Sequence, residues 1–209
     1  MYIAIEGVIG VGKTTLARLL KPAFNAEILL EIFEENPFLS DFYGDRDRYA
    51  FQTQIFFLLS RYHQQRRSVP ELLAKNENLL SDYTFAKDSL FARINLAGDE
   101  LDMYARVHEA LAEKIHQPDL LVFLRAETKT LMERIAMRDR PYERDMDSDY
   151  IAQLSETYEE FFSKPYQNTP VLTIDTDNLD FVRNPEDLVF IQKKIEAALQ
   201  ETPLQPDLI

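Results

Sequence analysis

The sequence predicts an α/β fold of three layers, in which a five-stranded parallel sheet carries helices on both faces. Short apolar runs rich in β-branched residues alternate with longer segments of helical period along the whole chain. Parallel neighbours need a crossover connection, and that crossover is usually a helix. The five predicted strands are Tyr2–Glu6, Glu27–Leu30, Asn78–Ser81, Asp119–Leu124 and Val171–Ile174.

Helices are predicted wherever apolar residues recur at helical spacing between these strands. We expect the last two helices to be capped by Asp147 or Ser148 and by Asn184, since short polar side chains accept hydrogen bonds from the free N–H groups of a first turn. No repeat or linker divides the chain, so residues 1–200 are expected to form one domain and 201–209 a tail. The predicted helices are Lys13–Leu20, Arg48–Arg66, Lys87–Leu96, Glu100–Ile115, Thr128–Arg138, Ser148–Phe162 and Pro185–Leu199.

Composition excludes several classes of function. The 209 residues carry 23 Lys and Arg against 36 Asp and Glu, a net charge of −13, whereas binding to nucleic acid or to an anionic membrane needs a basic surface. With no cysteine, there is no disulfide and no thiolate site. The N-terminus lacks the pattern of a secretory leader, and no apolar run approaches the roughly 18 residues of a membrane span. We therefore expect a cytoplasmic protein without nucleic-acid or membrane partners.

A phosphate-binding loop is the strongest motif. Residues 7–14 read GVIGVGKT and fit G-x-x-x-x-G-K-[ST] directly between the first predicted strand and helix. Such a loop points backbone N–H groups at phosphate oxygens, its lysine reaches the β- and γ-phosphates, and its hydroxyl ligates Mg²⁺. The fold is therefore predicted to be of the P-loop NTPase type, with ATP held by Gly7, Gly10, Gly12, Lys13, Thr14 and Thr15.

An acidic cluster at residues 30–39 follows the second predicted strand. Ligands of open α/β sheets bind at the carboxyl ends of the strands. Glu31, the first residue after the apolar run, is best placed to accept the proton of a hydroxyl that attacks the γ-phosphate. A solvated acidic loop is the alternative interpretation. The base-reading N-K-x-D segment of a GTPase switch does not occur in the sequence.

Two further segments carry polar side chains suited to a nucleotide substrate. Gln54 and Arg61 are seven residues apart and share a helix face, where the glutamine amide can pair with a base edge; glutamines on helices otherwise face solvent. Four arginines fall within residues 134–144, and guanidinium groups there can clamp triphosphate oxygens as a lid over about 134–147. A solvated basic helix end is the alternative for this cluster.

These ordered motifs resemble the deoxynucleoside kinase family, and within it the bacterial deoxyadenosine/deoxyguanosine kinase branch, from the P-loop to about Ile195. The resemblance implies ATP-dependent phosphorylation of the 5′-hydroxyl of a deoxynucleoside, Mg²⁺ as cofactor, and a homodimer or a dimer with a related subunit. The resemblance also implies a role for individual residues. Glu31 would be the general base, Tyr43 and Glu143 would bind the 3′-hydroxyl, and Gln54, Arg61 and Phe91 would face the base. Arg134, Arg138 and Arg140 would form the lid, Asp82 and Thr14 would lie at the metal, and Asp175 and Asp177 would lie beside the donor adenine.

One segment departs from the family pattern. Many members end the third strand with an acid, an arginine and a serine, whereas this chain has Asp82, Tyr83 and Thr84. Either another group, such as a lid arginine, assumes the arginine's role, or the alignment slips by one residue. It stays open whether Lys87 or Asp88 faces the base.

The substrate also keeps alternatives at this stage. A purine deoxynucleoside is expected from the branch, but a glutamine amide can also turn to meet a pyrimidine such as deoxycytidine or thymidine. A thymidylate-kinase-like nucleoside-monophosphate kinase shares the P-loop and the lid arginines, but it needs an extra arginine where this chain has the Glu31 cluster. A non-catalytic nucleotide sensor is the alternative outside the enzymes.

Overall fold

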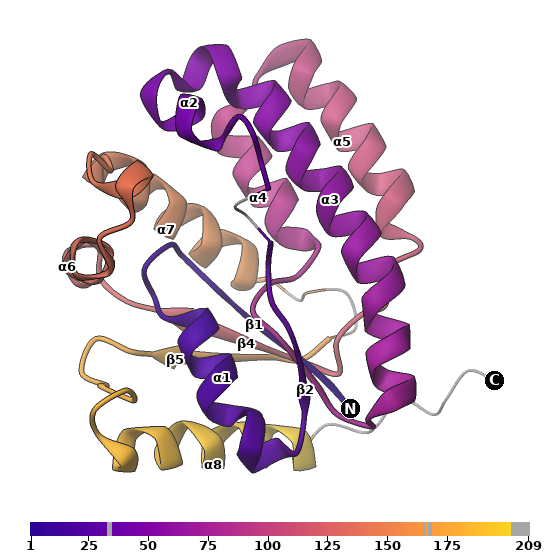
Figure 1. Ribbon diagram of the computed structural model, residues 1–209, viewed down its shortest axis with the longest axis vertical. Helices are drawn as coiled ribbons and strands as arrows, with labels where there is room; N and C mark the ends of the chain where they lie inside the picture. Colours follow the sequence, from indigo (N-terminus) through magenta and orange to yellow (C-terminus); the bar gives the residue numbers. More distant parts are fainter. Residues whose placement is uncertain (33–34, 165, 167–168, 202–209) are drawn as a thin grey trace.

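A five-stranded parallel sheet forms the centre of the molecule, which is described by a computed structural model for residues 1–32, 35–164, 166 and 169–201. The strand order is β2-β3-β1-β4-β5, and every pairing is parallel (Figure 1). All five predicted strands are confirmed within one residue at each end. They are β1 Tyr2–Gly7, β2 Glu27–Leu29, β3 Leu79–Ser81, β4 Leu120–Arg125 and β5 Val171–Asp175.

The helices follow the predicted order with two additions, α2 and the single 3₁₀ turn η1. The helix predicted to end at Arg66 continues to Lys75, because Val69 beyond that point is buried against the sheet together with Tyr2. The helices are α1 Lys13–Phe24, α2 Leu39–Gly44, α3 Arg46–Lys75, α4 Ala86–Asn95, α5 Gly98–Ala112, α6 Thr128–Arg138, η1 Pro141–Glu143, α7 Ser148–Phe162 and α8 Pro185–Glu201.

Both predicted caps are present. The Asp147 carboxylate accepts a hydrogen bond from the Asp149 N–H at 2.9 Å, and the Asn184 side chain accepts one from the Glu186 N–H at 3.1 Å. Helix α8 includes Glu201, which the sequence assigned to the tail. Residues 202–209, and residues 33 and 34 of the acidic cluster, lie outside the described part of the chain.

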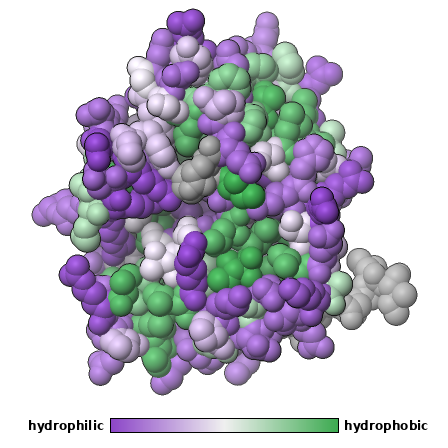
Figure 2. All heavy atoms as spheres, viewed as in Figure 1, coloured by the Kyte–Doolittle hydropathy of each residue, from purple (hydrophilic) through white to green (hydrophobic). Residues whose placement is uncertain are grey.

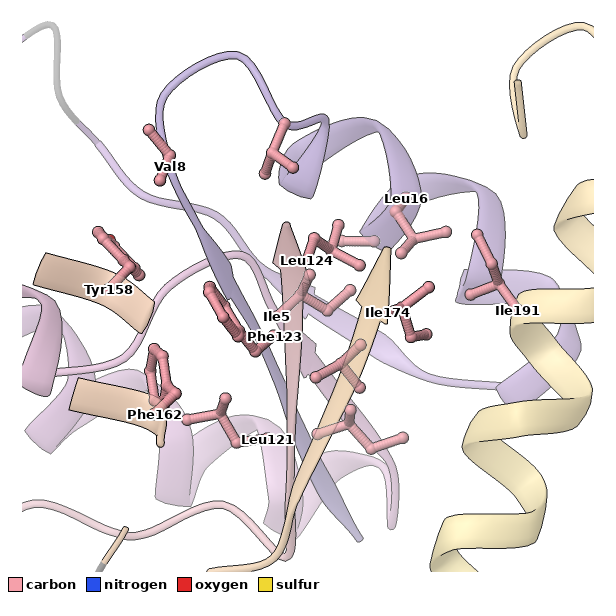
Figure 3. Close-up of a cluster of buried hydrophobic side chains, with 14 of the residues drawn as sticks. Ile5, Val8, Leu16, Leu121, Phe123, Leu124, Tyr158, Phe162, Ile174 and Ile191 are labelled. Atoms are coloured by element: carbon pink, nitrogen blue, oxygen red, sulfur yellow. The ribbon is translucent and has the colours of Figure 1, made fainter. Parts of the chain in front are cut away.

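The apolar core lies on both faces of the sheet. Successive side chains of a strand point to opposite faces, so Phe123 packs against Tyr158 and Phe162 of α7, whereas Leu124 lies on the side of α1 and α8 (Figure 3). Helix α3 covers the rest of the sheet face on which α7 packs, and α5 packs against the outer side of α3 (Figure 1). No helix in the described ranges is long and apolar enough to cross a membrane.

The order of the strands positions a ligand crevice. From β1 the chain crosses to β2 on one side, and from β3 it crosses back over β1 to β4 on the other. Such a change of direction leaves a crevice at the carboxyl ends of the strands. The loop after β1, beginning at Gly7, and the segment after β3, beginning at Asp82, meet there. Gly7 has φ +147°, and a Cβ at this position would lie 2.3 Å from the Leu124 carbonyl oxygen, so the close approach to β4 requires glycine.

Candidate active site

A cavity of about 930 Å³ opens at this crevice, a size that accommodates a nucleoside with a triphosphate. Its walls come from the P-loop, α2, α3, α4, α6, η1 and the loop before α8. Most of the residues singled out by the sequence line it. They are Gly10, Gly12, Lys13, Thr14, Thr15, Glu31, Tyr43, Gln54, Arg61, Asp82, Phe91, Arg134, Arg138, Arg140, Glu143 and Asp177.

Two of the expected nucleotide contacts, Gly7 and Asp175, do not line this cavity. Gly7 instead supplies a carbonyl oxygen to the P-loop lysine. The Asp175 carboxylate forms an ion pair with Arg125 at 3.3 Å, at the end of the neighbouring strand. Asp177, two residues on, reaches the cavity and accepts a hydrogen bond from the Glu127 N–H at 2.9 Å.

The P-loop is curled around its own lysine. Gly10 and Gly12 have φ +88° and +101°, conformations that glycine adopts without strain. The Lys13 ammonium donates to the carbonyl oxygens of Gly7 at 2.6 Å and Val8 at 3.1 Å. Burial, together with the nearby Lys87 ammonium, lowers the pKa of Lys13 to about 8. A phosphate would replace these carbonyls as a stronger, charged partner.

Thr14 and Asp82 form the pair that fits a Mg²⁺ ion. The Thr14 hydroxyl hydrogen-bonds to Asp82 Oδ2, and both residues line the cavity. The described residues contain no cluster of three or more His, Cys, Asp or Glu side chains that could hold a metal. Mg²⁺ is commonly bound through one or two protein oxygens plus substrate phosphates, so a hydroxyl and a carboxylate beside the P-loop suit it.

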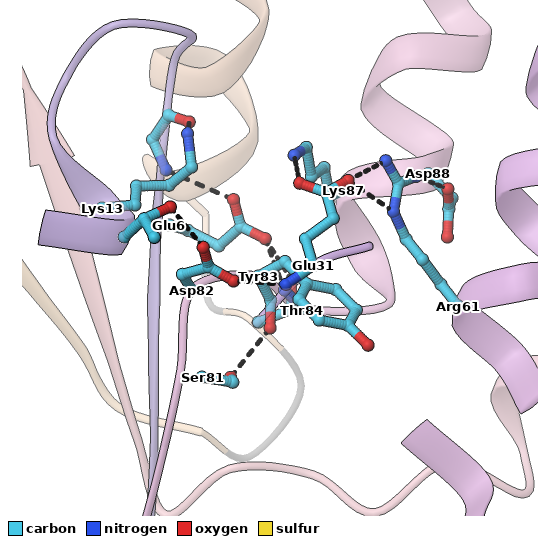
Figure 4. A network of polar contacts seen from close by, with 12 residues as sticks. Glu6, Lys13, Glu31, Arg61, Ser81, Asp82, Tyr83, Thr84, Lys87 and Asp88 are labelled. Atoms are coloured by element: carbon cyan, nitrogen blue, oxygen red, sulfur yellow. Dashed lines mark hydrogen bonds and ion pairs between the residues drawn. The ribbon is translucent and has the colours of Figure 1, made fainter. Parts of the chain in front are cut away.

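Glu31 lies at the centre of a buried polar network (Figure 4). Its backbone N–H donates to Asp82 Oδ1 at 2.8 Å. Its carboxylate accepts from Arg61 Nε at 2.9 Å and from Lys87 Nζ at 2.5 Å. Burial alone would raise the pKa of Glu31, but the Arg61 and Lys87 charges outweigh it and hold the pKa well below its usual range. The carboxylate is therefore ionised and fixed in the cavity wall.

Arg61 connects this network to the end of the cavity lined by α3. Its guanidinium also pairs with Asp88, which is fully buried, and lies 4.5 Å over the Phe57 ring. Of the two residues left open by the sequence, Lys87 lines the cavity, whereas Asp88 does not. Gln54 is 2% exposed, and its Oε1 atom has no hydrogen-bond partner among the described residues. A buried acceptor of this kind calls for a donor from a ligand.

Tyr43 and Glu143 meet at another part of the wall. Tyr43 stacks on Tyr142 with ring centroids 6.1 Å apart, and burial raises its pKa well above the usual value, so its hydroxyl stays protonated. The buried Glu143 carboxylate accepts from Arg138 at 2.5 Å and from Arg140 at 3.5 Å. Two of the predicted lid arginines thus contact the carboxylate that the sequence placed near the sugar.

The third lid arginine, Arg134, joins α6 to the loop after β5. It donates to the Thr176 carbonyl at 2.7 Å and hydroxyl at 3.0 Å, and weakly to the P-loop carbonyl of Val11 at 3.5 Å. These partners are neutral oxygens. The positive charge of Arg134 therefore remains available to a phosphate in the cavity that it lines.

Glu6, the one charged residue of β1, belongs to none of the sequence motifs. Its fully buried carboxylate accepts from the Thr84 N–H at 2.6 Å, the Thr84 hydroxyl at 2.9 Å and the Tyr158 hydroxyl at 3.2 Å. Burial raises its pKa, partly offset by Lys87 and Lys13. The available signal was a lone acid at the end of an apolar strand, directly before the P-loop.

The fold and this site define a P-loop protein of the nucleotide-dependent phosphotransferase class. The family model for deoxynucleoside kinases matches residues 3–200, and the chain belongs to the deoxynucleoside kinase family. It is 36% identical to a deoxyguanosine kinase of Bacillus subtilis over 89% of this chain and 91% of the relative. It is 35% identical to a deoxyadenosine kinase of Dictyostelium discoideum over 90% of this chain and 76% of the relative.

A solved structure is similar over nearly the whole chain. A deoxyadenosine kinase from M. mycoides, with dCMP and dCDP bound as products, superimposes with a TM-score of 0.81 at 27% identity, covering 94% of this chain and all of that one. The predicted family and the α/β fold with a five-stranded parallel sheet are thus confirmed. The protein is a kinase that phosphorylates deoxynucleosides.

The lowered pKa of Lys13 predicts a pH dependence of ATP binding. In the free protein the ammonium deprotonates near pH 8, but binding to phosphate requires the charged form. The Kd for ATP should therefore rise about tenfold per pH unit above pH 8, with proton uptake on binding. Calorimetric titrations at pH 7 to 9.5, in buffers of different ionisation enthalpy, measure both quantities. A Kd for ATP that stays constant to pH 9.5 contradicts this prediction.

Proposed function

We propose that the protein transfers the γ-phosphoryl group of ATP to the 5′-hydroxyl of a 2′-deoxynucleoside, with a purine base preferred. The observation that carries this proposal is the position of Glu31. Its ionised carboxylate lines the same cavity as the P-loop, and its N–H is bonded to the carboxylate that contacts Thr14. A proton acceptor for an attacking hydroxyl is thus directly linked to the residues suited to the phosphates.

In the proposed mechanism each residue has a separate task. The P-loop N–H groups and Lys13 hold the β- and γ-phosphates. Thr14 and Asp82 would hold a Mg²⁺ ion, which would supply positive charge to the phosphate oxygens. Glu31 orients the 5′-hydroxyl and takes its proton. Its low pKa keeps it ionised, and so able to accept a proton, throughout the physiological pH range.

The predicted lid belongs to this mechanism. Arg138 and Arg140 contact Glu143 in the free protein, and Arg134 is anchored beside the P-loop. We propose that the lid over about 134–147 closes on the triphosphate and supplies positive charge in the transition state, which can contribute about 10³-fold or more in rate. Asp177 and the loop around it are proposed to border the donor adenine.

The sugar and base ends of the cavity support a deoxynucleoside acceptor. Tyr43 and Glu143 are proposed to bond the 3′-hydroxyl and to crowd a ribose 2′-hydroxyl. Phe91 is proposed to pack on the base, and the unpaired Gln54 oxygen fits a purine N–H group. The names of the similar kinases also favour deoxyguanosine or deoxyadenosine.

Two alternatives remain for the substrate. One relative, 25% identical, is a deoxyadenosine/deoxycytidine kinase of Bacillus subtilis, which keeps a pyrimidine acceptor as the second candidate. A nucleoside monophosphate acceptor is disfavoured, because Arg61 is already paired with Glu31 and Asp88 and these carboxylates would repel a phosphate.

We further propose a cytoplasmic homodimer, formed through α3 and α5. These helices pack against each other and leave Leu59, Met103 and Val107 exposed. Figure 2 shows hydrophobic side chains at the surface in the upper right of the view, where α3 and α5 lie. Exposed apolar side chains on adjoining helices suit burial against a second copy. A related subunit is the alternative partner. ATP as the donor favours the cytoplasm.

Nucleoside specificity is tested by ADP release with a panel of deoxyadenosine, deoxyguanosine, deoxycytidine, thymidine and adenosine. The purine deoxynucleosides should give the highest kcat/KM, and adenosine should be slower by about tenfold or more because its 2′-hydroxyl crowds Tyr43 and Glu143. Equal rates on adenosine and deoxyadenosine contradict the proposed sugar contacts. A preference for thymidine or deoxycytidine selects the pyrimidine alternative.

The role of Glu31 is tested by Glu31→Gln, which keeps the size of the side chain and removes its charge. Turnover should fall by about 10²- to 10⁴-fold, the usual contribution of a general base, while the Kd for ATP stays within a few fold. Single-turnover measurements separate the chemical step from binding. Unchanged turnover contradicts the assignment.

The homodimer is tested by sedimentation of the purified full chain. Twice the chain mass is expected, and Leu59→Glu combined with Met103→Glu should shift the profile toward monomer, since each places a charge in the proposed interface. A monomeric profile of the unaltered protein at micromolar concentration contradicts the dimer.

A further inference from the structure

The cavity contains a buried cation, Lys87, whose role the sequence motifs left open. Lys87 is in the first turn of α4 and only 7% exposed, yet it lines the cavity. Its ammonium donates to Glu31 Oε2 at 2.5 Å and lies 5.5 Å from the centre of the Phe91 ring. Burying a lysine is costly unless its charge is compensated, so its position beside the proposed base requires an explanation.

Lys87 also acts on the phosphate side of the cavity. Its charge lowers the pKa of Lys13 and counteracts the raised pKa of Glu6, so it is electrostatically coupled to the P-loop as well as to Glu31. Figure 4 shows its ammonium at Glu31, on the side of that carboxylate turned toward Lys13, with the Arg61–Asp88 pair beyond. A 5′-oxygen that attacks the γ-phosphate would have to lie between that phosphate and Glu31. The ammonium groups of Lys13 and Lys87 border this space.

The hydrogen bonds of Lys87 leave donors for a ligand. An ammonium has three N–H groups, and Glu31 is the one side chain in the described ranges that accepts from it. Glu31 has a second cation in Arg61, which occupies Oε1 through Nε at 2.9 Å. Because Arg61 also pairs with Asp88, the four groups form two cation–carboxylate pairs, in which Lys87 balances one charge and keeps two N–H groups for a ligand.

Tyr83 leaves this part of the cavity without the positive charge that an arginine at position 83 would supply. The tyrosine, where many family members have an arginine, is fully buried, and its hydroxyl donates to Gln64 Oε1 at 2.5 Å. Gln64 in turn donates to the Leu30 carbonyl at 2.8 Å, directly before Glu31. Position 83 thus supports the backbone of the Glu31 segment and brings no charge to the cavity. The charge comes instead from Lys87, four residues later in the first turn of α4.

We propose that Lys87 is a further catalytic residue, whose ammonium contacts the 5′-oxygen and the γ-phosphoryl group during transfer. The 5′-hydroxyl proton passes to Glu31, the 5′-oxygen forms a bond to the γ-phosphorus, and the bond from that phosphorus to the bridging oxygen breaks, leaving its electron pair on ADP. Lys87 stays protonated and stabilises the negative charge shared by the two groups. The inference rests on the proposed phosphorylation of a 5′-hydroxyl with Glu31 as the proton acceptor.

The first test compares Lys87→Met, which keeps the length and removes the charge, with Lys87→Arg. For Lys87→Met, kcat should fall by about 10²- to 10³-fold, as for the loss of one charge-stabilising donor, with the Kd of the deoxynucleoside within about threefold. The kcat of Lys87→Arg should be at least tenfold higher than that of Lys87→Met. Lys21→Met is the matched control, because Lys21 is an exposed lysine that pairs with Glu27 at the far end of α1, and its kcat should not change. A kcat for Lys87→Met within threefold of the unaltered enzyme overturns the proposal.

The absence of cysteine from the sequence allows a second, direct test. Lys87→Cys introduces the only thiol, and alkylation with 2-bromoethylamine, during unfolding and refolding if needed, restores an ammonium on a side chain of nearly the original length. Methylthiolation gives a neutral adduct as control. The aminoethyl adduct should regain at least tenfold in kcat and the neutral adduct none. Equal rates for the two adducts overturn the proposal, because the aminoethyl adduct carries a positive charge and the methylthio adduct carries none.

Comparison with Glu31→Gln separates failure of the Lys87 role from failure of the whole proposed mechanism. If Glu31→Gln turns over at the full rate, the proposed base is wrong. If Glu31→Gln is slow but Lys87→Met is not, only the role of Lys87 is wrong.

Discussion

The site depends on one buried carboxylate held by two buried cations. Glu31 lies at the edge of the sheet and is largely shielded from water. Burial alone would favour the neutral form of its carboxyl group, but the Arg61 and Lys87 charges keep it ionised. The three side chains come from the segment after β2, from α3 and from α4. Packing of α3 and α4 onto the sheet therefore determines the charge of Glu31, and with it the chemistry of the cavity.

The net charge of −13 becomes understandable from this arrangement. A deoxynucleoside is uncharged, so a broadly basic surface would attract only the phosphate donor. Positive charge is placed at the cavity by Lys13, Arg61, Lys87 and the lid arginines Arg134, Arg138 and Arg140. Several of these cations are buried with carboxylates, and the backbone amides of the P-loop add neutral donors for phosphate.

Much of the site was accessible from the sequence because its motifs are local. The P-loop joins a strand to a helix within eight residues, and Gln54 and Arg61 share a face because seven residues make two helical turns. Where the prediction was incomplete, the missing information was long-range. Glu6 bonds to Tyr158 across 152 positions, and no spacing rule connects the two. Asp175 was expected at the donor site, but its carboxylate turns to Arg125 of the neighbouring strand.

The sequence by itself determined the parallel α/β fold, the P-loop and the family, since apolar periodicity and contiguous motifs depend on near neighbours along the chain. Only the tertiary structure decided the partners of Lys87 and Asp88. These adjacent residues differ by about 100° around α4, so one reaches Glu31 in the cavity and the other reaches Arg61 in the interior. That direction depends on how α4 packs against α3 and α7, which no local pattern in the sequence encodes.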